Sequence, residues 1–261
     1  MQADIYQQFT EQLIANLEAD DRVKGLVLLG STANQSHPPD QWSDHDFFVI
    51  TDSGVQELFR TRFDWLPNSE SIVLTVRETA HGLKVLYEDG HLLEYAVFDM
   101  TEISLAKAND YVIAFDRGEI TTAMQKIVVQ SSTMTYSADQ QARDAGLFLC
   151  LLVVGAGRVV RGEQISGQVF VRAYALSHLL RILIHMQGIS DKSSLDNLDI
   201  YRRFEHVFPQ LGDEINAVLA GDTISVALGL LDIYERALPH KENSPTDAIN
   251  TVRHFLLRIT T

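Results

Sequence analysis

Two short motifs near the N-terminus contain residue types that can bind a metal ion and a phosphate. Asp44 and Asp46 flank His45 at the start of an apolar run, FFVI. If this run is a β-strand, its side chains alternate between the two faces of a sheet, so both carboxylates lie on one face, about 7 Å apart. Carboxylates in this arrangement repel each other unless a cation lies between them, and hard oxygen ligands favour Mg²⁺ or Mn²⁺. Two such ions can stabilise the attacking and leaving oxygens of a phosphoryl or nucleotidyl transfer.

Twelve residues separate a Gly-Ser pair from the first of these acids. Gly30 and Ser31 follow the apolar run GLVLL, which predicts a buried strand. If the chain turns from this strand into a helix, backbone N–H groups, the helix dipole and the Ser31 hydroxyl together form a phosphate site. Gly30 suits this corner because a Cβ there would hold the phosphates away from the backbone. Ser43, directly before the first acid, is a candidate for a further hydroxyl contact.

Each motif is weak by itself, and the combination is what indicates a function. The chain has 35 Asp and Glu among 261 residues, so composition alone accounts for about four or five acid-x-acid triplets. On an exposed turn such a triplet is normally a solvated surface. Here, however, both motifs lie at the ends of apolar strands and are close in sequence, which favours a functional site.

The elements expected to position these motifs form an α/β unit with about five strands. Ile5, Phe9, Leu13 and Leu17 recur with helical spacing. The Asp-Gly pair at 89–90 lies between two apolar runs and predicts a β-hairpin. Strands are predicted at 25–29, 44–51, 72–76, 83–87 and 92–98, with a further helix at 55–65.

From about residue 137 the chain is expected to be entirely helical. Ser137 and Gln140 have the spacing of a capping box before a long apolar helix. Gly188 is expected to end one helix, and Ser244 to cap the last one. Helices are predicted at 137–160, 169–186, 199–207, 212–220, 223–238 and 245–259. The predicted fold class is an α/β (α+β) domain with a mixed sheet, residues 1–120, followed by an all-α helical bundle, residues 121–261.

Composition narrows the class of protein. The net charge is −14 with 46% hydrophobic residues, which fits a globular chain and argues against one that coats nucleic acid or an anionic membrane. A single cysteine, Cys150, excludes an intramolecular disulfide. The N-terminus lacks the features of a secretory signal, and the longest apolar stretch, 147–157, is too short to span a membrane. We therefore expect a cytoplasmic protein with neither a nucleic-acid nor a membrane partner.

The pattern of these motifs resembles that of the polymerase-β-type nucleotidyltransferase superfamily. It consists of an apolar run, Gly-Ser, a short spacer, and Asp-x-Asp before another apolar strand. The closest resemblance is to the bacterial aminoglycoside and lincosamide nucleotidyltransferases. It covers residues 25–51 and extends weakly to 92–99 and 161–163. The resemblance implies a catalytic α/β domain followed by a helical one, a nucleoside triphosphate as substrate, and Mg²⁺ as cofactor (two ions, with Mn²⁺ as an alternative). Some members of the family build the site across a dimer, so the resemblance also allows this chain to form a homodimer.

The resemblance also implies a third carboxylate from a neighbouring strand. Glu94 is the first choice, because an acid inside the apolar strand LLEYAVF is costly without a partner. It is predicted to be both a metal ligand and a base for the acceptor hydroxyl. Asp99 is the alternative, and it could instead be a strand-end or capping residue. Glu102 and Glu163 are further candidates for the base.

Other polar residues carry weaker indications. Arg158 and Arg161 could reach the triphosphate, or they could simply stabilise the C-terminal end of a helix. His178, Arg181 and His185 share a helix face, but no acid at ligand spacing accompanies them, so a zinc site is not expected. P-loop, dinucleotide-binding and α/β-hydrolase motifs are absent from the sequence.

The predicted reaction is transfer of a nucleoside monophosphate to a hydroxyl of a small molecule such as an aminoglycoside or lincosamide antibiotic, with release of pyrophosphate. An acceptor that is a protein or another metabolite is the alternative within this chemistry. A catalytically silent binding protein on the same fold is the alternative outside it.

Overall fold

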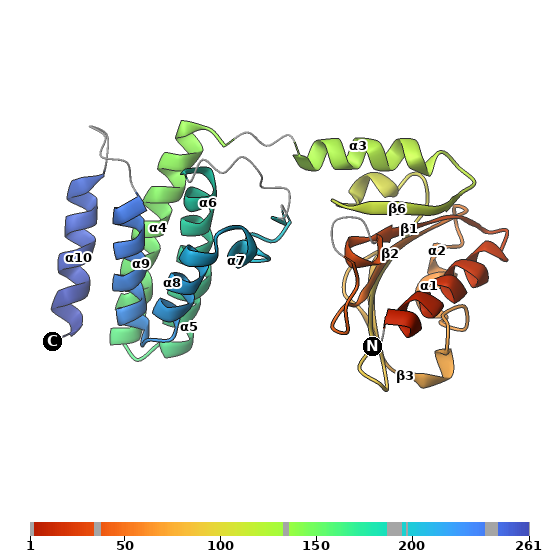
Figure 1. The fold of residues 1–261 in the computed structure, drawn as a ribbon, viewed down its shortest axis with the longest axis horizontal. Coiled ribbons are helices and arrows are strands. Elements are labelled where there is room, and N and C mark those ends of the chain that lie inside the picture. The colour runs from red at the N-terminus through yellow and green to blue at the C-terminus, as the bar shows by residue number, and fades with distance from the viewer. Residues whose placement is uncertain are drawn as a thin grey trace. The chain divides into compact units, whose positions relative to one another are not determined.

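The chain folds into an α/β unit followed by a helical unit. The computed structural model describes residues 3–33, 38–132, 136–186, 195–196, 198–237 and 245–260, with the side chains of 129–132 excepted. The two compact units are Met1–Thr133 and Met134–Thr261 (Figure 1). This order confirms the predicted fold class. The predicted boundary at residue 120 coincides with the first residue of α3 (Ile120–Ser132), which belongs to the first unit.

The first unit is built on a mixed six-stranded sheet. Its strand order is β3-β4-β5-β2-β1-β6, and β2 runs parallel to β5 while the other neighbouring pairs are antiparallel. The hairpin predicted at Asp89-Gly90 joins β4 to β5, with Gly90 at φ +87°. The strands are β1 (Val23–Leu29), β2 (His45–Thr51), β3 (Ile72–Arg77), β4 (Gly82–Tyr87), β5 (Leu92–Phe98) and β6 (Tyr111–Asp116).

Each face of the sheet is covered by helices, because successive strand residues alternate between two apolar cores. One face packs against Phe9, Leu13 and Leu17 of α1 (Ala3–Glu18) and against α2 (Gln56–Thr61). The other face packs against α3, whose Ile120 and Met124 are fully buried. Short 3-10 turns at Gly30–Ala33 (η1), Ser69–Ser71 (η2) and Ile103–Leu105 (η3) complete the unit.

Three local predictions for the first unit differ from the structure, and in the second unit the helix predicted at 199–207 is only Phe204–Val207. The sheet has a sixth strand, β6, which pairs with β1 in a stretch where no strand was predicted. The helix predicted over 55–65 ends at Thr61, because Arg62 is extended and its carbonyl accepts a hydrogen bond from the Trp65 indole. The chain after Gly30 forms the single 3-10 turn η1, so the helix dipole expected there is not present.

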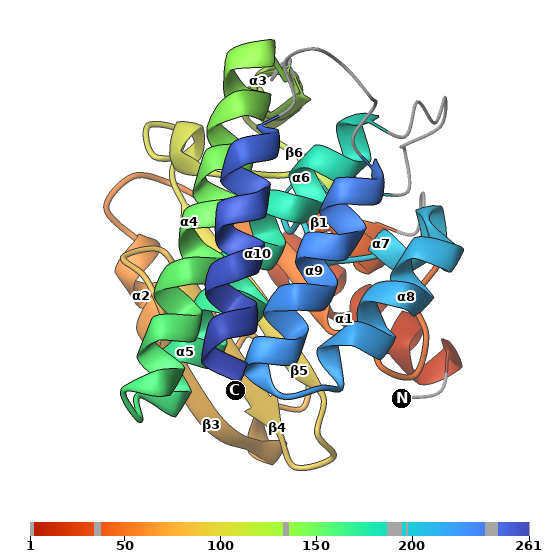
Figure 2. The ribbon, with the colours of Figure 1, turned by 90° about the vertical axis from the view of Figure 1, so that its left-hand side faces the viewer.

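The second unit consists of helices around one apolar core. The capping box at Ser137 and Gln140 is confirmed at the start of α4. Figure 2 shows α9 and α10 beside α4. The predicted signals at Gly188 and Ser244 lie outside the described residues. The elements are α4 (Ala138–Val160), α5 (Gln164–Val169), a π-helical turn η4 (Phe170–Ala175), α6 (Leu176–Met186), α7 (Phe204–Val207), α8 (Pro209–Leu219), α9 (Thr223–Ala237) and α10 (Thr246–Thr260).

The continuous helical stretch Gln164–Met186 is long and apolar enough to cross a membrane, with a mean hydropathy of 1.3. Its residues Leu179, Ile182 and Leu183 are fully or almost fully buried against the neighbouring helices. Of the apolar window in this stretch, 44% is buried inside the structure.

Candidate functional site

The parallel pairing of β2 with β5 brings two of the predicted acids together. Asp46 and Glu94 are direct partners in the ladder, and Asp44 comes just before β2. Carboxylate oxygens of all three residues lie within 4.8 Å of one another, and all three side chains are half-buried. The structure therefore brings together Asp44, Asp46 and Glu94, and we refer to them as the carboxylate cluster.

Two hydroxyl groups hold the backbone around the first two acids. Tyr6 of α1 donates a hydrogen bond to the Asp44 carbonyl (2.8 Å), and Thr32 accepts one from the Asp46 N–H (3.0 Å). The two hydroxyls also bond to each other at 2.7 Å. Burial raises the pKa of Tyr6 to about 12, so it remains a neutral donor. Through these hydrogen bonds, α1 and η1 hold the backbone at the start of β2 in place. Neither Tyr6 nor Thr32 was predicted as a site residue from the sequence.

Lys84 brings a positive charge to the cluster. It is the antiparallel partner of Glu94 on β4, and its ammonium group bonds to the Glu94 carboxylate. It lies 3.7 Å from Glu78 as well, and its pKa is raised, mainly by the hydrogen bond to Glu94. The period of two in β4 and β5 could have revealed this pair, had the register of the hairpin been used.

The cluster suits a divalent cation. At an effective dielectric constant of about 20, two carboxylates separated by 4.8 Å repel each other by roughly 3 kcal/mol. The donors are all carboxylate oxygens, the type that Mg²⁺ and Mn²⁺ prefer. Oxygens on opposite sides of Mg²⁺ are about 4.2 Å apart, so small side-chain movements are enough to surround an ion. These three residues could therefore hold the metal.

Gly30 contributes space beside the cluster. Its φ of +51° is in the left-handed region, and a Cβ at this position would lie 3.4 Å from Oδ2 of Asp46. Its N–H donates to the carbonyl of Asp110 (3.2 Å). The contribution of Gly30 is thus its conformation and its missing side chain.

The two predicted serines lie in different settings. Ser31 is buried in η1, where its hydroxyl bonds to that of Tyr6 and opposes the rise in the pKa of the tyrosine. Ser43 is in a turn with Asp40, where its hydroxyl accepts from the Asp40 N–H (2.9 Å) and donates to the carboxylate (3.2 Å). Both hydroxyls thus bond within the chain.

Behind the cluster, on the α1 face, lies a pair of buried histidines. Nδ1 of His45 is 2.7 Å from Nε2 of His91, and Nε2 of His45 is 2.9 Å from the Thr10 hydroxyl. Burial lowers the pKa of His45 to about 3 and that of His91 to about 4, so both rings are neutral near pH 7. The rings of Tyr6 and His45 stack with centroids 3.7 Å apart. These contacts pack against β2 on the face of the sheet that α1 covers.

The alternatives to Glu94 lie at the other end of β5. Asp99 follows the strand, about 17 Å along the chain from Glu94. It bonds to Thr101 and Gln56, and the Thr101 hydroxyl is the main cause that lowers its pKa to about 2. Glu102 pairs with the buried Arg60 at 2.9 Å. The capping interpretation of Asp99 fits these contacts.

The remaining candidates belong to the helical unit. Arg158 bonds to Ser166 and lies over the ring of Phe170, 3.9 Å from its centroid. Arg161 bonds to Glu163 at 3.0 Å. These contacts join the end of α4 to the next elements, which fits the helix-end interpretation of the two arginines.

Known proteins offer only weak similarities to this chain. No family model and no curated protein matches it. Among solved structures it aligns with an aminoglycoside 6-adenyltransferase from Bacillus subtilis, with a TM-score of 0.33 and 12% identity, over 98% of this chain and 95% of that one. It also aligns with a STING-associated CdnE c-di-GMP synthase from Capnocytophaga granulosa, with a TM-score of 0.32 and 13% identity, over 99% of this chain and 79% of that one.

Proposed function

We propose that the chain is a metal-dependent nucleotidyltransferase of the polymerase-β type. The observation that carries this proposal is the convergence of Asp44, Asp46 and Glu94, with oxygens within 4.8 Å, from two neighbouring strands. The Gly-Ser corner beside Asp46 supports it, because Gly30 leaves room next to a carboxylate. The reaction transfers a nucleoside monophosphate from a nucleoside triphosphate to an acceptor hydroxyl.

In this proposal the carboxylate cluster holds Mg²⁺, with one or two ions. The bound metal neutralises charge on the triphosphate and on the oxygens that attack and leave. An acceptor oxygen forms a bond to the α-phosphorus, the bond from that phosphorus to the bridging oxygen breaks, and pyrophosphate leaves. Glu94 takes the proton of the acceptor hydroxyl, and its carboxylate gives up the bond to Lys84 when the metal binds.

The proposed acceptor is a small hydroxylated molecule of the aminoglycoside or lincosamide type. The resemblance of residues 25–51 to those enzymes supports this class, and the net charge of −14 favours a cationic acceptor over a nucleic acid. Gly30 and Ser31 are proposed to line the triphosphate site, with Ser43 at its edge.

Thermal denaturation tests the proposal. The full chain is melted with each nucleoside triphosphate, with and without Mg²⁺, and Asp46→Asn is compared with Asp21→Asn at an exposed site. We expect stabilisation that needs both metal and triphosphate, is lost in Asp46→Asn and is kept in the control. Release of labelled pyrophosphate with a panel of acceptors then identifies the acceptor. Stabilisation that does not depend on metal, or that survives in Asp46→Asn, contradicts the proposal.

A further inference from the structure

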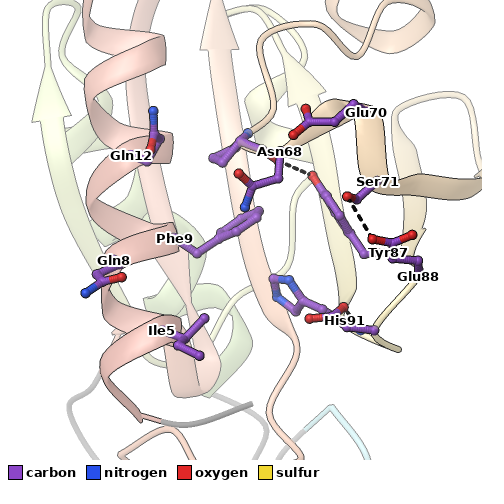
Figure 3. Close-up of a pocket in the computed structure, with 12 residues that line it drawn as sticks. Ile5, Gln8, Phe9, Gln12, Asn68, Glu70, Ser71, Tyr87, Glu88 and His91 are labelled. Atoms are coloured by element: carbon purple, nitrogen blue, oxygen red, sulfur yellow. Dashed lines mark hydrogen bonds between the residues drawn. The ribbon is translucent and has the colours of Figure 1, made fainter.

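A polar cavity lies on the opposite face of the sheet from the carboxylate cluster. It has a volume of about 420 Å³ between α1 and the turn that joins β4 to β5 (Figure 3). Asp46 and Glu94 are on the sheet face that α3 covers, whereas Phe9 and Tyr87 of this cavity belong to the core under α1. A molecule bound here is therefore separated from the carboxylates by the sheet.

The cavity combines aromatic rings with carboxylates. Phe9, Tyr87 and His91 are all buried and line its inner wall, with the Phe9 and His91 rings edge-to-face at 4.7 Å. Glu70 and Glu88 are exposed at its rim. Lysine and arginine are absent from the twelve described residues that line it. Aromatic faces and carboxylates are the groups that recognise an organic cation.

The negative charges of Glu70 and Asp89 influence Tyr87 on the inner wall of the cavity. Burial raises the pKa of the Tyr87 hydroxyl, and the nearby charges of Glu70 and Asp89 raise it further. That hydroxyl donates to the Pro67 carbonyl at 2.8 Å, so it remains neutral. The electrostatic potential in the cavity therefore favours a positively charged ligand.

The hydrogen-bond pattern of the histidine pair identifies the role of His91. The Thr10 hydroxyl donates to the Tyr6 carbonyl (3.1 Å), so it accepts from Nε2–H of His45. His45 Nδ1 is then an acceptor for Nε2–H of His91. The second nitrogen of His91, Nδ1, is left as an acceptor on a residue that is only 8% exposed and lines the cavity.

We propose that this cavity is a binding site for a small organic polyamine. Protonated amino groups bind the rim carboxylates and stack on the Phe9 and Tyr87 rings, and one N–H donates to Nδ1 of His91. Its volume is at the lower end of the range for small-molecule sites, roughly 300–1,000 Å³. His91 bonds to His45, which lies between Asp44 and Asp46 in the sequence. The bound amine therefore contacts the histidine pair that packs behind the carboxylate cluster. This site does not depend on the proposed transferase activity.

Calorimetric titration of the metal-free full chain with spermidine tests the proposal at about 150 mM salt, where non-specific attraction is screened. We expect one site on the wild type and about tenfold weaker binding by Glu70→Gln/Glu88→Gln, which loses two charged contacts. The matched control is Glu11→Gln/Glu18→Gln, which makes the same charge change at exposed positions of α1 outside the cavity. Choline, which has no N–H, is expected to bind more weakly than spermidine.

Nuclear magnetic resonance of ¹⁵N-labelled imidazoles supplies the second readout. The His91 Nδ1 signal is expected to shift with spermidine in the wild type and in Asp46→Asn. Equal weakening in both double variants would mean general charge attraction and overturn the proposal. Loss of binding in Asp46→Asn with retention in Glu70→Gln/Glu88→Gln would assign the amine to the carboxylate cluster, and the absence of both heat and signal shift would leave no site. Either result overturns the proposal without deciding the transferase activity.

Discussion

Two partly buried acidic sites in this chain are built in opposite ways. In the sheet unit, three carboxylates converge within 4.8 Å, and Lys84 bonds to one of them. In the helical unit, the single carboxylate of Asp144 is surrounded by donors: His178 at 2.6 Å, the Tyr136 hydroxyl at 2.9 Å and Arg181 at 3.4 Å.

We interpret Asp144 as a structural acid and the carboxylate cluster as the proposed ligand site. Asp144 receives its hydrogen bonds and positive charge from residues of its own unit, so its contacts serve folding. The carboxylate cluster brings like charges together at a sheet end, an arrangement that a divalent ion from solution stabilises. Substitutions at the two sites should therefore change different properties.

The largest expected effect is on activity at the cluster. Asp46→Asn removes a charged ligand, and we expect nucleotidyl transfer to fall by about 10²- to 10³-fold. Initial rates of pyrophosphate release measure this, with Asp144→Asn as the comparison in the other unit. A variant that keeps more than half of the wild-type rate would contradict the role given to Asp46.

At the helical site the expected loss is in stability. Asp144→Ala leaves a histidine, an arginine and a tyrosine hydroxyl without their acceptor, which we expect to cost about 2–4 kcal/mol of unfolding free energy. Urea denaturation measures it, and Asp139→Ala, at an exposed position of the same helix, is the control. Equal stability of the two variants would show that the Asp144 contacts contribute little.

The histidines extend the comparison to pH. His178 faces a carboxylate, whereas burial lowers the pKa of His45 to about 3 and of His91 to about 4. Below their unfolded pKa, about 6.5, the unfolded chain binds more protons than the folded one, so stability falls as pH drops from 7 towards 4. We expect His91→Gln to reduce this slope in urea melts between pH 7 and 4. An unchanged slope would argue against a neutral, buried His91.

Without metal, the substitution Asp46→Asn, which is expected to lower activity, should stabilise the fold. Asp46→Asn removes like-charge repulsion from the cluster, and we expect a gain of about 1 kcal/mol in unfolding free energy in EDTA. Added Mg²⁺ should reverse the order of wild type and variant. Destabilisation in EDTA would mean that the protein contacts of Asp46 outweigh the repulsion within the cluster.

The smallest effect is expected at Lys84. Its ammonium competes with a metal ion for Glu94, so Lys84→Met should tighten Mn²⁺ binding by about three- to tenfold, or roughly 1 kcal/mol. Titration followed by electron paramagnetic resonance measures this, and Lys24→Met, whose partner is Asp52, is the control. Weaker Mn²⁺ binding would show instead that Lys84 holds Glu94 in place for the metal.

The three acids could be predicted from the sequence, but the residues that contact them, Tyr6, Thr32 and Lys84, were not. Asp44 and Asp46 could be placed because they open an apolar strand, and Glu94 because a carboxylate inside such a strand needs a partner. Asp46 faces Glu94 because β2 pairs with β5, although β3 and β4 lie between these two strands in the sequence. The spacing of residues along one chain does not contain that register.

Contacts between distant elements explain what was missed. Tyr6 and Thr32 bond across 26 positions, and this depends on where α1 packs against the sheet. His178 was considered without a partner acid, yet Asp144 lies 34 positions away on the neighbouring helix. Strand β6 was missed although its sequence, YVIAFD, begins with five consecutive apolar or aromatic residues; it lies at the edge of the sheet, where those five side chains are only half-buried.

Anomalous diffraction from crystals soaked with Mn²⁺ and a non-hydrolysable nucleoside triphosphate tests the central claim most directly. We expect a manganese peak among the oxygens of Asp44, Asp46 and Glu94, with the triphosphate beside Gly30. A crystal with manganese elsewhere, or with triphosphate bound away from these carboxylates, would contradict the account.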